Sequence, residues 1–314
     1  MGVQRCTDTI HLLTEPIEKK QWEEQLRYLW RSCFDDPLHY EDFYFCKVYA
    51  HNQVYVIDGK GMIHLNYYPC RVFGQEVRLP YIVGVATRKD CRRQGVMRSL
   101  LERAISDMQA DGIPFTYLMP ASEAYYEPFG FCSVSQKNEC EMELSGHWEQ
   151  DIQFVSYQEI KKMPQREKAS FFDRIHQWLS ERYDVYAIHD EDYFDLLCAE
   201  KACQSGDVVF AFEGEMIDFN LCGVFAYAIQ EEVPHVEQMV LGKGTKISSD
   251  KEWKEVVSVL LSGYFKEYKK ATVTISYPYM LRVVDRVAFV EMFGEKRLEH
   301  LFTEKGCIYF AEIV

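Results

Sequence analysis

The segment from Arg88 to Arg98, RKDCRRQGVMR, holds five basic residues and one acidic residue. It lies between an apolar run, YIVGVA (81–86), and a stretch whose apolar residues recur every three or four positions. The first pattern is typical of a strand that is buried on both faces, and the second of an amphipathic helix. The sequence therefore predicts a central strand over Leu79–Thr87, a basic loop, and a helix that starts at Gly95 and ends near Gly112.

Further strands and a helix surround this unit. Alternating apolar residues predict strands over Asn52–Asp58 and Met62–Val72, joined by a turn that contains two glycines. A third strand, Pro114–Pro120, follows the helix, and helical spacing of apolar residues runs through Trp22–Trp30. The order in the first half of the chain is therefore strand, glycine loop, helix, strand.

The same order returns in the second half. A strand is predicted over Val236–Leu241, a helix over Trp253–Tyr268 and a strand over Ala271–Pro278. The loop between the first two, GKGTKISS, has glycines but lacks an Arg/Gln-x-x-Gly pattern at the helix start. We interpret the repeat as a structural duplication whose second copy has no phosphate site. Coincidence is the alternative, because strand–helix–strand units are common.

The overall composition excludes several classes of protein. The formal net charge of −14 argues against a nucleic-acid partner, which needs a broad basic face, and is compatible with a cationic substrate. No apolar stretch is long enough to span a membrane, and the N-terminus lacks the apolar core of a secretory signal, so we expect a cytoplasmic protein without a membrane partner. The eleven cysteines form no Cys-x-x-Cys pair. Reduced thiols are therefore expected, and no metal site.

The basic glycine loop has a chemical use at the start of a helix. A helix N-terminus presents unpaired N–H groups and the positive end of the helix dipole. A glycine allows a ligand to approach this backbone, so that the loop can hold phosphate groups. The glycine patterns of dinucleotide folds and of P-loops are both absent.

The loop residues Arg92-Arg93-Gln94-Gly95-Val96-Met97 resemble the pyrophosphate-binding loop, Arg/Gln-x-x-Gly-x-Gly/Ala, of the GCN5-related N-acetyltransferases (GNAT). Met97 departs from that pattern, because the family has a small residue there. Together with LMPASEAYYEPFGF (118–131) and the end CIYFAEIV (307–314), the sequence resembles the Eis-type (enhanced intracellular survival) acetyltransferases.

This resemblance implies a domain organisation. Eis-type proteins have two tandem acetyltransferase-like domains, of which only the first binds acetyl-CoA, followed by a sterol-carrier-like domain. We therefore expect an α/β fold with mixed sheets: a GNAT domain over 1–147, a degenerate GNAT-like domain over 148–280, and a short segment, 281–314, that returns to the active site. Most of a sterol-carrier-like domain is then missing. The family assembles as a homo-oligomer, and the sequence leaves the oligomeric state of this chain open.

The resemblance also implies which residues bind acetyl-CoA. The Val85 N–H is the candidate donor to the carbonyl oxygen, as charge develops on it. Ala86 and Thr87 are expected to pair with the pantetheine arm like an added strand. The complete set of implied cofactor-binding residues is Val85, Ala86, Thr87, Arg92, Arg93, Gln94, Gly95, Val96, Met97, Arg98 and Ser122.

Two further roles follow from the resemblance. Tyr126 is implied as the acid that protonates the leaving thiolate, for which a phenol is competent. Tyr125 is the nearest rival, and we expect strand alternation to place it on the opposite face. The terminal carboxylate of Val314 is implied as the base that takes the proton of the amine. The apolar residues of CIYFAEIV predict that this end is buried, which would raise the pKa of that carboxylate.

The favoured function is an N-acetyltransferase that moves an acetyl group from acetyl-CoA to a primary amine by direct attack. The family implies acceptors of the aminoglycoside, polyamine or lysine-bearing peptide class. Candidate contacts for the acceptor cation are Asp35, Asp36, Glu123 and Glu312, which as an alternative are solvated surface charges. Two other functions stay open: a non-catalytic acetyl-CoA-binding or sensing protein, and a transferase of a longer acyl or aminoacyl group.

Overall fold

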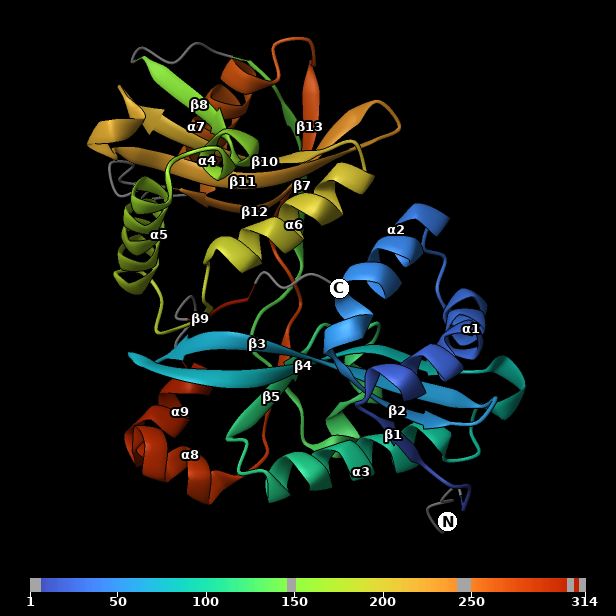
Figure 1. Ribbon diagram of the computed structural model, residues 1–314. Coiled ribbons are helices and arrows are strands. Elements are labelled where there is room, and N and C mark those ends of the chain that lie inside the picture. Colours follow the sequence, from blue (N-terminus) through green and yellow to red (C-terminus); the bar gives the residue numbers. More distant parts are fainter. Residues whose placement is uncertain (1–6, 146–150, 242–249, 304–307, 311–314) are drawn as a thin grey trace.

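The fold consists of two lobes, each built on a mixed β-sheet, in a computed structural model that describes residues 7–145, 151–241, 250–303 and 308–310 (Figure 1). The sheet of the first lobe has the strand order β1-β2-β3-β4-β5-β14-β6, with β9 on the outer edge of β3 and β15 on β9. These strands are β1 (His11–Leu13), β2 (Gln53–Ile57), β3 (Gly61–Val72), β4 (Gln75–Thr87), β5 (Phe115–Leu118), β6 (Cys132–Ser133), β9 (Val185–Ala187), β14 (Met280–Val283) and β15 (Ile308–Tyr309).

Helices cover both faces of the first sheet. α1 (Pro16–Cys33) and α2 (Leu38–Phe43) bury apolar side chains in one cluster with strands β3 and β4, and α3 (Val96–Ala110) packs in a separate cluster on the other face. The apolar residues of α3 are buried and its polar residues face outward, as their spacing predicts. Two further helices, α8 (Arg286–Phe293) and α9 (Glu295–Thr303), follow β14 and join the first lobe.

The sheet of the second lobe has the order β7-β13-β12-β11-β10-β8. α7 (Asp250–Tyr264) packs on one face, and α5 (Gln165–Ser180) and α6 (Glu191–Cys203) pack on the other, with the short α4 (Tyr157–Lys161) beside them. The strands are β7 (Asn138–Glu143), β8 (Ile152–Ser156), β10 (Asp207–Glu213), β11 (Leu221–Gln230), β12 (Val233–Leu241) and β13 (Lys270–Ser276).

The two lobes repeat one topology, which confirms the tandem fold expected from the sequence. In each sheet the second, third and fourth strands are antiparallel, and a helix then leads to a parallel fifth strand. The parallel pairs correspond residue by residue, with Ile82 opposite Leu118 in one lobe and Val236 opposite Val273 in the other. β4 and β12 also share a bulge directly after this pair.

The lobes exchange their sixth strands. β7 comes from the first half of the chain but pairs with β13 in the second sheet, and β14 follows β13 but pairs with β5 in the first sheet. The chain thus crosses between the sheets after residue 133 and again after residue 276. The domain limits at residues 147 and 280 stay predictions, because exchanged strands rather than a single linker connect the lobes.

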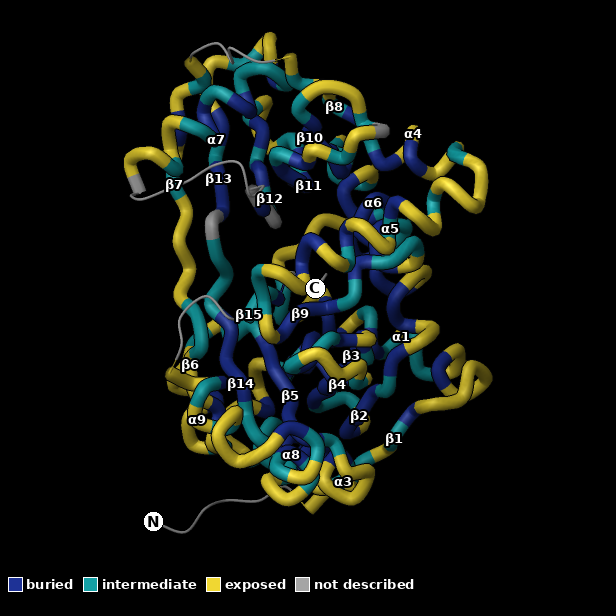
Figure 2. Tube along the Cα trace, turned by 90° about the vertical axis from the view of Figure 1, so that its left-hand side faces the viewer, coloured by how far each residue is buried: buried dark blue, intermediate teal, exposed yellow. Residues whose placement is uncertain are grey.

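One buried cluster spans both lobes. It contains Tyr81 of β4 together with Tyr186 of β9 and Phe194 of α6, all almost inaccessible to solvent. Figure 2 shows buried strands through both sheets, with exposed residues mainly on the outer helices and loops. The lobes therefore share a core.

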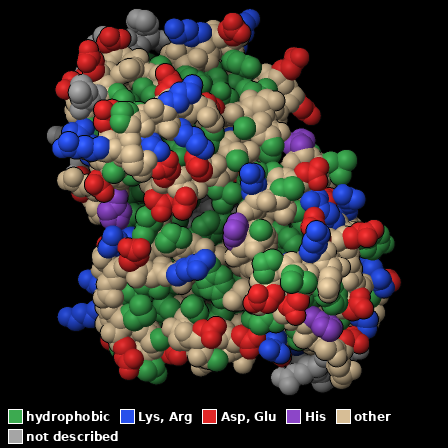
Figure 3. All heavy atoms as spheres, in the orientation of Figure 1, with side chains coloured by type: hydrophobic (Ala, Val, Ile, Leu, Met, Phe, Trp, Pro, Cys, Tyr) green, Lys and Arg blue, Asp and Glu red, His purple; other side chains and the backbone are tan. Residues whose placement is uncertain are grey.

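Most elements expected from the sequence are present. The helix predicted over Trp253–Tyr268 ends at Tyr264, because the chain turns at Phe265, whose ring is buried against Phe225 and Tyr227. Within the described ranges, no helix combines the length and apolarity that a membrane span requires, and no group of three His, Cys, Asp or Glu residues is arranged to hold a metal. Asp and Glu side chains are scattered over both lobes on the face in Figure 3.

Candidate functional site

The two central parallel strands of the first sheet separate where β5 ends. Tyr81 lies opposite Tyr117, and Ile82 opposite Leu118, and in the described structure the pairing stops there. β4 continues for five residues to Thr87, held only by β3 on its other side. The edge of β4 that faces away from β3 is therefore available to an extended ligand over these five residues.

A β-bulge lies at the start of this open edge. Met62 and His64 of β3 pair with Ala86 and Val83, so that Gly84 and Val85 together oppose a single residue. Gly84 has a φ of +60°, and a Cβ there would lie 3.0 Å from Trp30 Cζ3 and 3.3 Å from His64 Cγ. Only glycine fits without strain, and the bulge redirects the backbone of Val85 and its neighbours.

The basic loop connects this edge to α3. Arg88 pairs with Asp90 at 2.6 Å, and the Gln94 side chain donates to the Asp90 carbonyl at 2.8 Å, so the loop is internally braced. Gly95 is the N-cap residue of α3 with a φ of +83°. No side chain caps the helix, and its first turn has no acidic residue. The N–H groups of the first turn therefore present a positive potential to the space beside Thr87.

The predicted loop residues differ in their environments. Arg92, Arg93 and Gln94 are exposed, whereas Val96 is buried in the core of the first lobe and Met97 packs at its margin. Arg98 forms an ion pair with Glu102 at 3.2 Å, and its guanidinium lies 4.9 Å from the centre of the Phe129 ring. Arg98, in the first turn of α3, thus contacts the segment that follows β5.

That segment carries the predicted acid. Tyr126 is 6% exposed and lies between two 3₁₀ turns, Glu123–Tyr125 and Glu127–Phe129. Its ring packs edge-on against Phe131, in the same cluster as Val85 and Met97. Burial raises the pKa of Tyr126 to about 12. Among the described residues its hydroxyl makes no hydrogen bond, so its proton is available to a ligand.

Tyr125 points outward with 60% of its surface exposed. The two tyrosines do differ in burial as expected, but strand alternation is not the reason: Tyr125 ends the first 3₁₀ turn and Tyr126 is the residue between the two turns. Ser122 is the half-buried N-cap residue of the first of these turns, and its carbonyl accepts from the Tyr125 N–H at 3.1 Å. It therefore lies at the start of the segment that carries Tyr126.

The predicted base, Val314, and the candidate contact Glu312 lie outside the described residues. The chain before them is described up to Phe310, which is 4% exposed. The ring of Phe310 stacks on Tyr117 of β5 at 3.9 Å and an angle of 11°. The C-terminal segment therefore contacts β5 one residue before the point where β4 and β5 separate.

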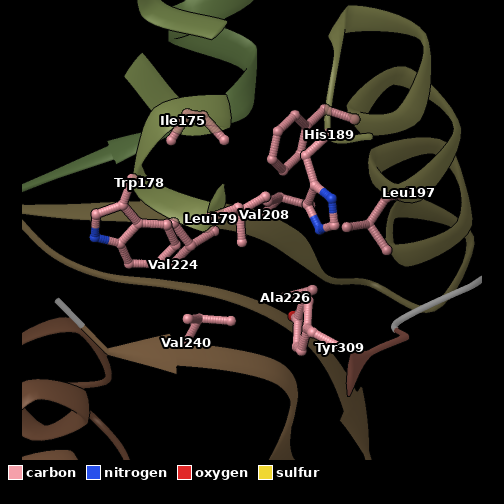
Figure 4. Close-up of a pocket in the computed structure, with 11 residues that line it drawn as sticks. Ile175, Trp178, Leu179, His189, Leu197, Val208, Val224, Ala226, Val240 and Tyr309 are labelled. Atoms are coloured by element: carbon pink, nitrogen blue, oxygen red, sulfur yellow. The ribbon is translucent and has the colours of Figure 1, made fainter. Parts of the chain in front are cut away.

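The same segment also closes a small cavity in the second lobe. Tyr309 lines it, together with His189 and side chains from α5, α6 and β10–β12 (Figure 4). Burial lowers the pKa of His189 to about 4, so its imidazole is neutral. The cavity has a volume of about 20 Å³, which is room for one water molecule. It is therefore part of the packing rather than a ligand site.

Two aromatic residues beside the bulge were not anticipated from the sequence. His64 is fully buried, and its Nδ1 lies 3.0 Å from the Tyr44 hydroxyl. Burial lowers the pKa of His64 to about 3, so it is neutral. Trp30 covers Gly84 and donates from Nε1 to Asp36 at 2.8 Å. The helical spacing over 22–30 included Trp30, but no local pattern indicated that Trp30 or His64 lies beside the bulge, because their partners there come from distant segments.

Asp36 is one of the candidate acceptor contacts. Its hydrogen bond with Trp30, which covers Gly84, places Asp36 near the bulge, and the Asp36 side chain remains exposed to solvent. Asp35 and Glu123 are also exposed.

Comparison with known proteins identifies the first lobe. Residues 14–134 match the family model described as "Acetyltransferase (GNAT) domain". Residues 14–134 are therefore similar to a GNAT acetyltransferase domain. The match includes the open edge of β4, the basic loop, α3 and Tyr126, which are the parts assembled above. Acyl-transfer chemistry and the use of an acyl-CoA are properties of this family.

Solved structures of similar fold cover both lobes. A probable N-acyltransferase from Enterococcus faecalis has a TM-score of 0.65 at 14% identity, over 90% of this chain and 74% of that one. Eis1 from Mycobacterium abscessus has a TM-score of 0.53 at 12% identity, over 88% and 73%. N-myristoyltransferase from Saccharomyces cerevisiae has a TM-score of 0.53 at 8% identity, over 90% and 80%. These likenesses show the fold. No curated protein matches the chain.

Proposed function

We propose that the GNAT domain transfers an acetyl group from acetyl-CoA to the primary amine of a small molecule or peptide. The open edge of β4 beside the uncapped start of α3 carries this proposal. The pyrophosphate is held by the N–H groups of Gly95, Val96 and Met97 and by the side chains of the basic loop. The pantetheine arm pairs with Ala86 and Thr87 on the free edge of β4.

In the proposed mechanism, the amine nitrogen attacks the thioester carbonyl carbon, and the carbonyl oxygen becomes an oxyanion. The Val85 N–H, directed by the bulge, stabilises that oxyanion, an effect commonly worth about 3 kcal/mol. The C–S bond then breaks, and Tyr126 donates its proton to the departing thiolate. The carboxylate of Val314 takes the proton that the amine loses. Asp36 attracts the cationic acceptor towards the bulge.

Binding and catalysis are tested separately. Purified protein is titrated with CoA by calorimetry, and CoA release from acetyl-CoA is then followed with a panel of aminoglycosides, polyamines and lysine-bearing peptides. We expect the double variant Arg93→Glu/Gln94→Glu to weaken CoA binding at least about tenfold, because it places acids at the positive end of α3. Unchanged CoA affinity in this variant contradicts the assigned site.

The same assay distinguishes the proposal from its alternatives. If the protein binds CoA but liberates no free CoA from acetyl-CoA with any amine, the result supports a sensing protein. Faster transfer from long-chain than from acetyl thioesters supports a longer acyl group, a substrate class named for the N-myristoyltransferase of similar fold. A form extended by several residues after Val314 tests the base: we expect it to bind CoA normally and to lose transfer.

A further inference from the structure

A second polar cavity lies at the outer edge of β3, away from the proposed acetyl-CoA site. β2 pairs with β3 only as far as Leu65, and β9 begins to pair at Cys70, so that residues 66–69 have no strand partner on this side within the described ranges. The gap opens into a cavity of about 100 Å³. Leu196 of α6 closes it from the second lobe.

The cavity is lined by basic side chains and by no acidic one. Lys47 and His51 line it from the consecutive turns Tyr44–Val48 and Tyr49–His51, and Arg78 lines it from β4. In the described structure neither Lys47 nor Arg78 has a carboxylate partner, although the chain has 49 acidic and 35 basic residues. By contrast, Arg27 and Arg31 both pair with Glu41. The Arg78 guanidinium lies over the Tyr67 ring, 5.6 Å from its centre, and neither this contact nor any described carboxylate neutralises the two cations. Two cations without an acidic partner beside one cavity of an acidic protein favour an anionic ligand.

A buried donor gives an independent indication. Asn66 lines the cavity and is 3% exposed. Its Oδ1 accepts from the Tyr44 hydroxyl at 3.3 Å and from Asn52 Nδ2 at 3.2 Å, and these two donors fix the orientation of the amide. Its Nδ2 has no hydrogen-bond partner in the described structure. A buried donor without a partner is costly, and an acceptor atom in the cavity would remove that cost.

We propose that this cavity binds a small tetrahedral oxyanion, either inorganic phosphate or the phosphate of a monoester. The cavity of about 100 Å³ is several times larger than the one-water cavity of about 20 Å³ beside Tyr309, so it admits a group larger than one water molecule, such as a phosphate. Arg78 and Lys47 supply charge-assisted hydrogen bonds, and Asn66 Nδ2 supplies a neutral one. The ligand also contacts α6, so its binding stabilises the contact between the lobes.

The proposed anion site is separate from the basic glycine loop. Arg78 precedes Thr87 on the same strand by nine positions, which corresponds to about 30 Å of extended chain. A phosphate bound at α3 therefore cannot contact Arg78. Phosphate affinity can therefore be measured in variants of each site separately, and the result does not depend on whether acetyl-CoA is the co-substrate.

The test is calorimetric titration of the intact protein with inorganic phosphate and, in parallel, with glycerol 3-phosphate, in chloride buffer. We compare the wild type with the double variant Lys47→Ala/Arg78→Ala. We expect this variant to weaken binding about tenfold or more, because two charge-assisted contacts are lost. Both side chains are exposed, so folding is expected to be unaffected. Tighter binding of the monoester identifies a phosphorylated metabolite as the ligand, and equal or weaker binding identifies free phosphate.

Two control variants make the result specific. Lys162→Ala/Arg166→Ala removes the same charge from exposed positions of the second lobe and should leave phosphate affinity unchanged. Arg92→Ala/Arg93→Ala removes charge from the glycine loop, which can itself hold phosphate, and should leave unchanged the phosphate binding that is lost in the Lys47/Arg78 variant. A phosphate affinity that falls only in the Arg92/Arg93 variant, or equally in all three, overturns the proposal. Absence of measurable phosphate binding by the wild type also overturns it.

Discussion

Tyr126 combines a buried ring with a hydroxyl that no described residue engages. Because burial raises the pKa of Tyr126 to about 12, the phenol stays protonated from about pH 6 to pH 10. We expect Tyr126→Phe to lower kcat by about 10²- to 10⁴-fold, the usual contribution of a positioned acid. The affinity for CoA should not change, because the ring packing against Phe131 is kept.

The matched control is Tyr125→Phe, which removes an exposed hydroxyl from the adjacent residue and should leave kcat unchanged. CoA release is measured for both variants from about pH 6 to pH 10. In the wild type, Tyr126 should cause no alkaline decrease of kcat within this range, since its proton is lost only at higher pH. Equal losses in both variants would contradict the assignment of Tyr126 as the acid.

A buried cation in the second lobe gives a stability prediction at the same scale. Lys201 is 2% exposed and bonds to Glu200 and to Glu237. Lys201→Met leaves two carboxylates without their shared partner in the interior. We expect the free energy of unfolding to fall by about 3–5 kcal/mol in urea denaturation. Adding Glu200→Gln and Glu237→Gln should recover part of that loss, and a triple variant no more stable than Lys201→Met would refute this account.

At the scale of elements, the bulge in β4 is the feature on which the proposed oxyanion contact depends. Gly84→Ala forces a left-handed φ on a residue with a Cβ and brings that Cβ to 3.0 Å from Trp30. The backbone strain alone costs about 1–2 kcal/mol. Because the bulge must also move, we expect kcat for acetyl transfer to fall about tenfold or more.

Gly74→Ala is the control for backbone strain. Gly74 has a φ of +83° in the turn between β3 and β4, and a Cβ there meets nothing within 4 Å. Both variants should lose similar stability in thermal unfolding, and only Gly84→Ala should lose activity. If Gly74→Ala loses as much kcat, strain in the sheet rather than the position of Val85 explains the effect.

The elements themselves follow from local pattern more closely than their partners do. The period of apolar residues placed α3, β3 and β4 correctly, because each buries a continuous face. The sequence could not place β14, a strand of four residues, beside β5, which lies more than 160 positions earlier. Nor could it show that His64 lies under Gly84, since that contact depends on the bulge. The local sequence pattern determines which residues of an element are buried, whereas the pairing of short strands depends on how the whole core packs.

At the scale of the whole molecule, the exchanged strands make each lobe depend on the other half of the chain. Residues 1–147, the predicted first domain, lack β14, whose Met280 and Leu281 are 1% and 0% exposed beside β5. They also retain β7 without its partner β13. We expect this fragment to be aggregated or largely unfolded in circular dichroism and proton NMR spectra, because an apolar strand edge is left open.

A rearranged fragment provides the decisive comparison. Residues 7–133, joined by a flexible linker to residues 277–303, contain every strand from β1 to β6 together with β14, α8 and α9. Both fragments lack β9, the partner of one end of β3. We expect the rearranged fragment to unfold more cooperatively than residues 1–147, since both neighbours of β14 are restored. If residues 1–147 fold as stably as the rearranged fragment, the first sheet does not need β14. The lobes would then be independent domains, and the strand exchange a contact formed after folding rather than a condition for it.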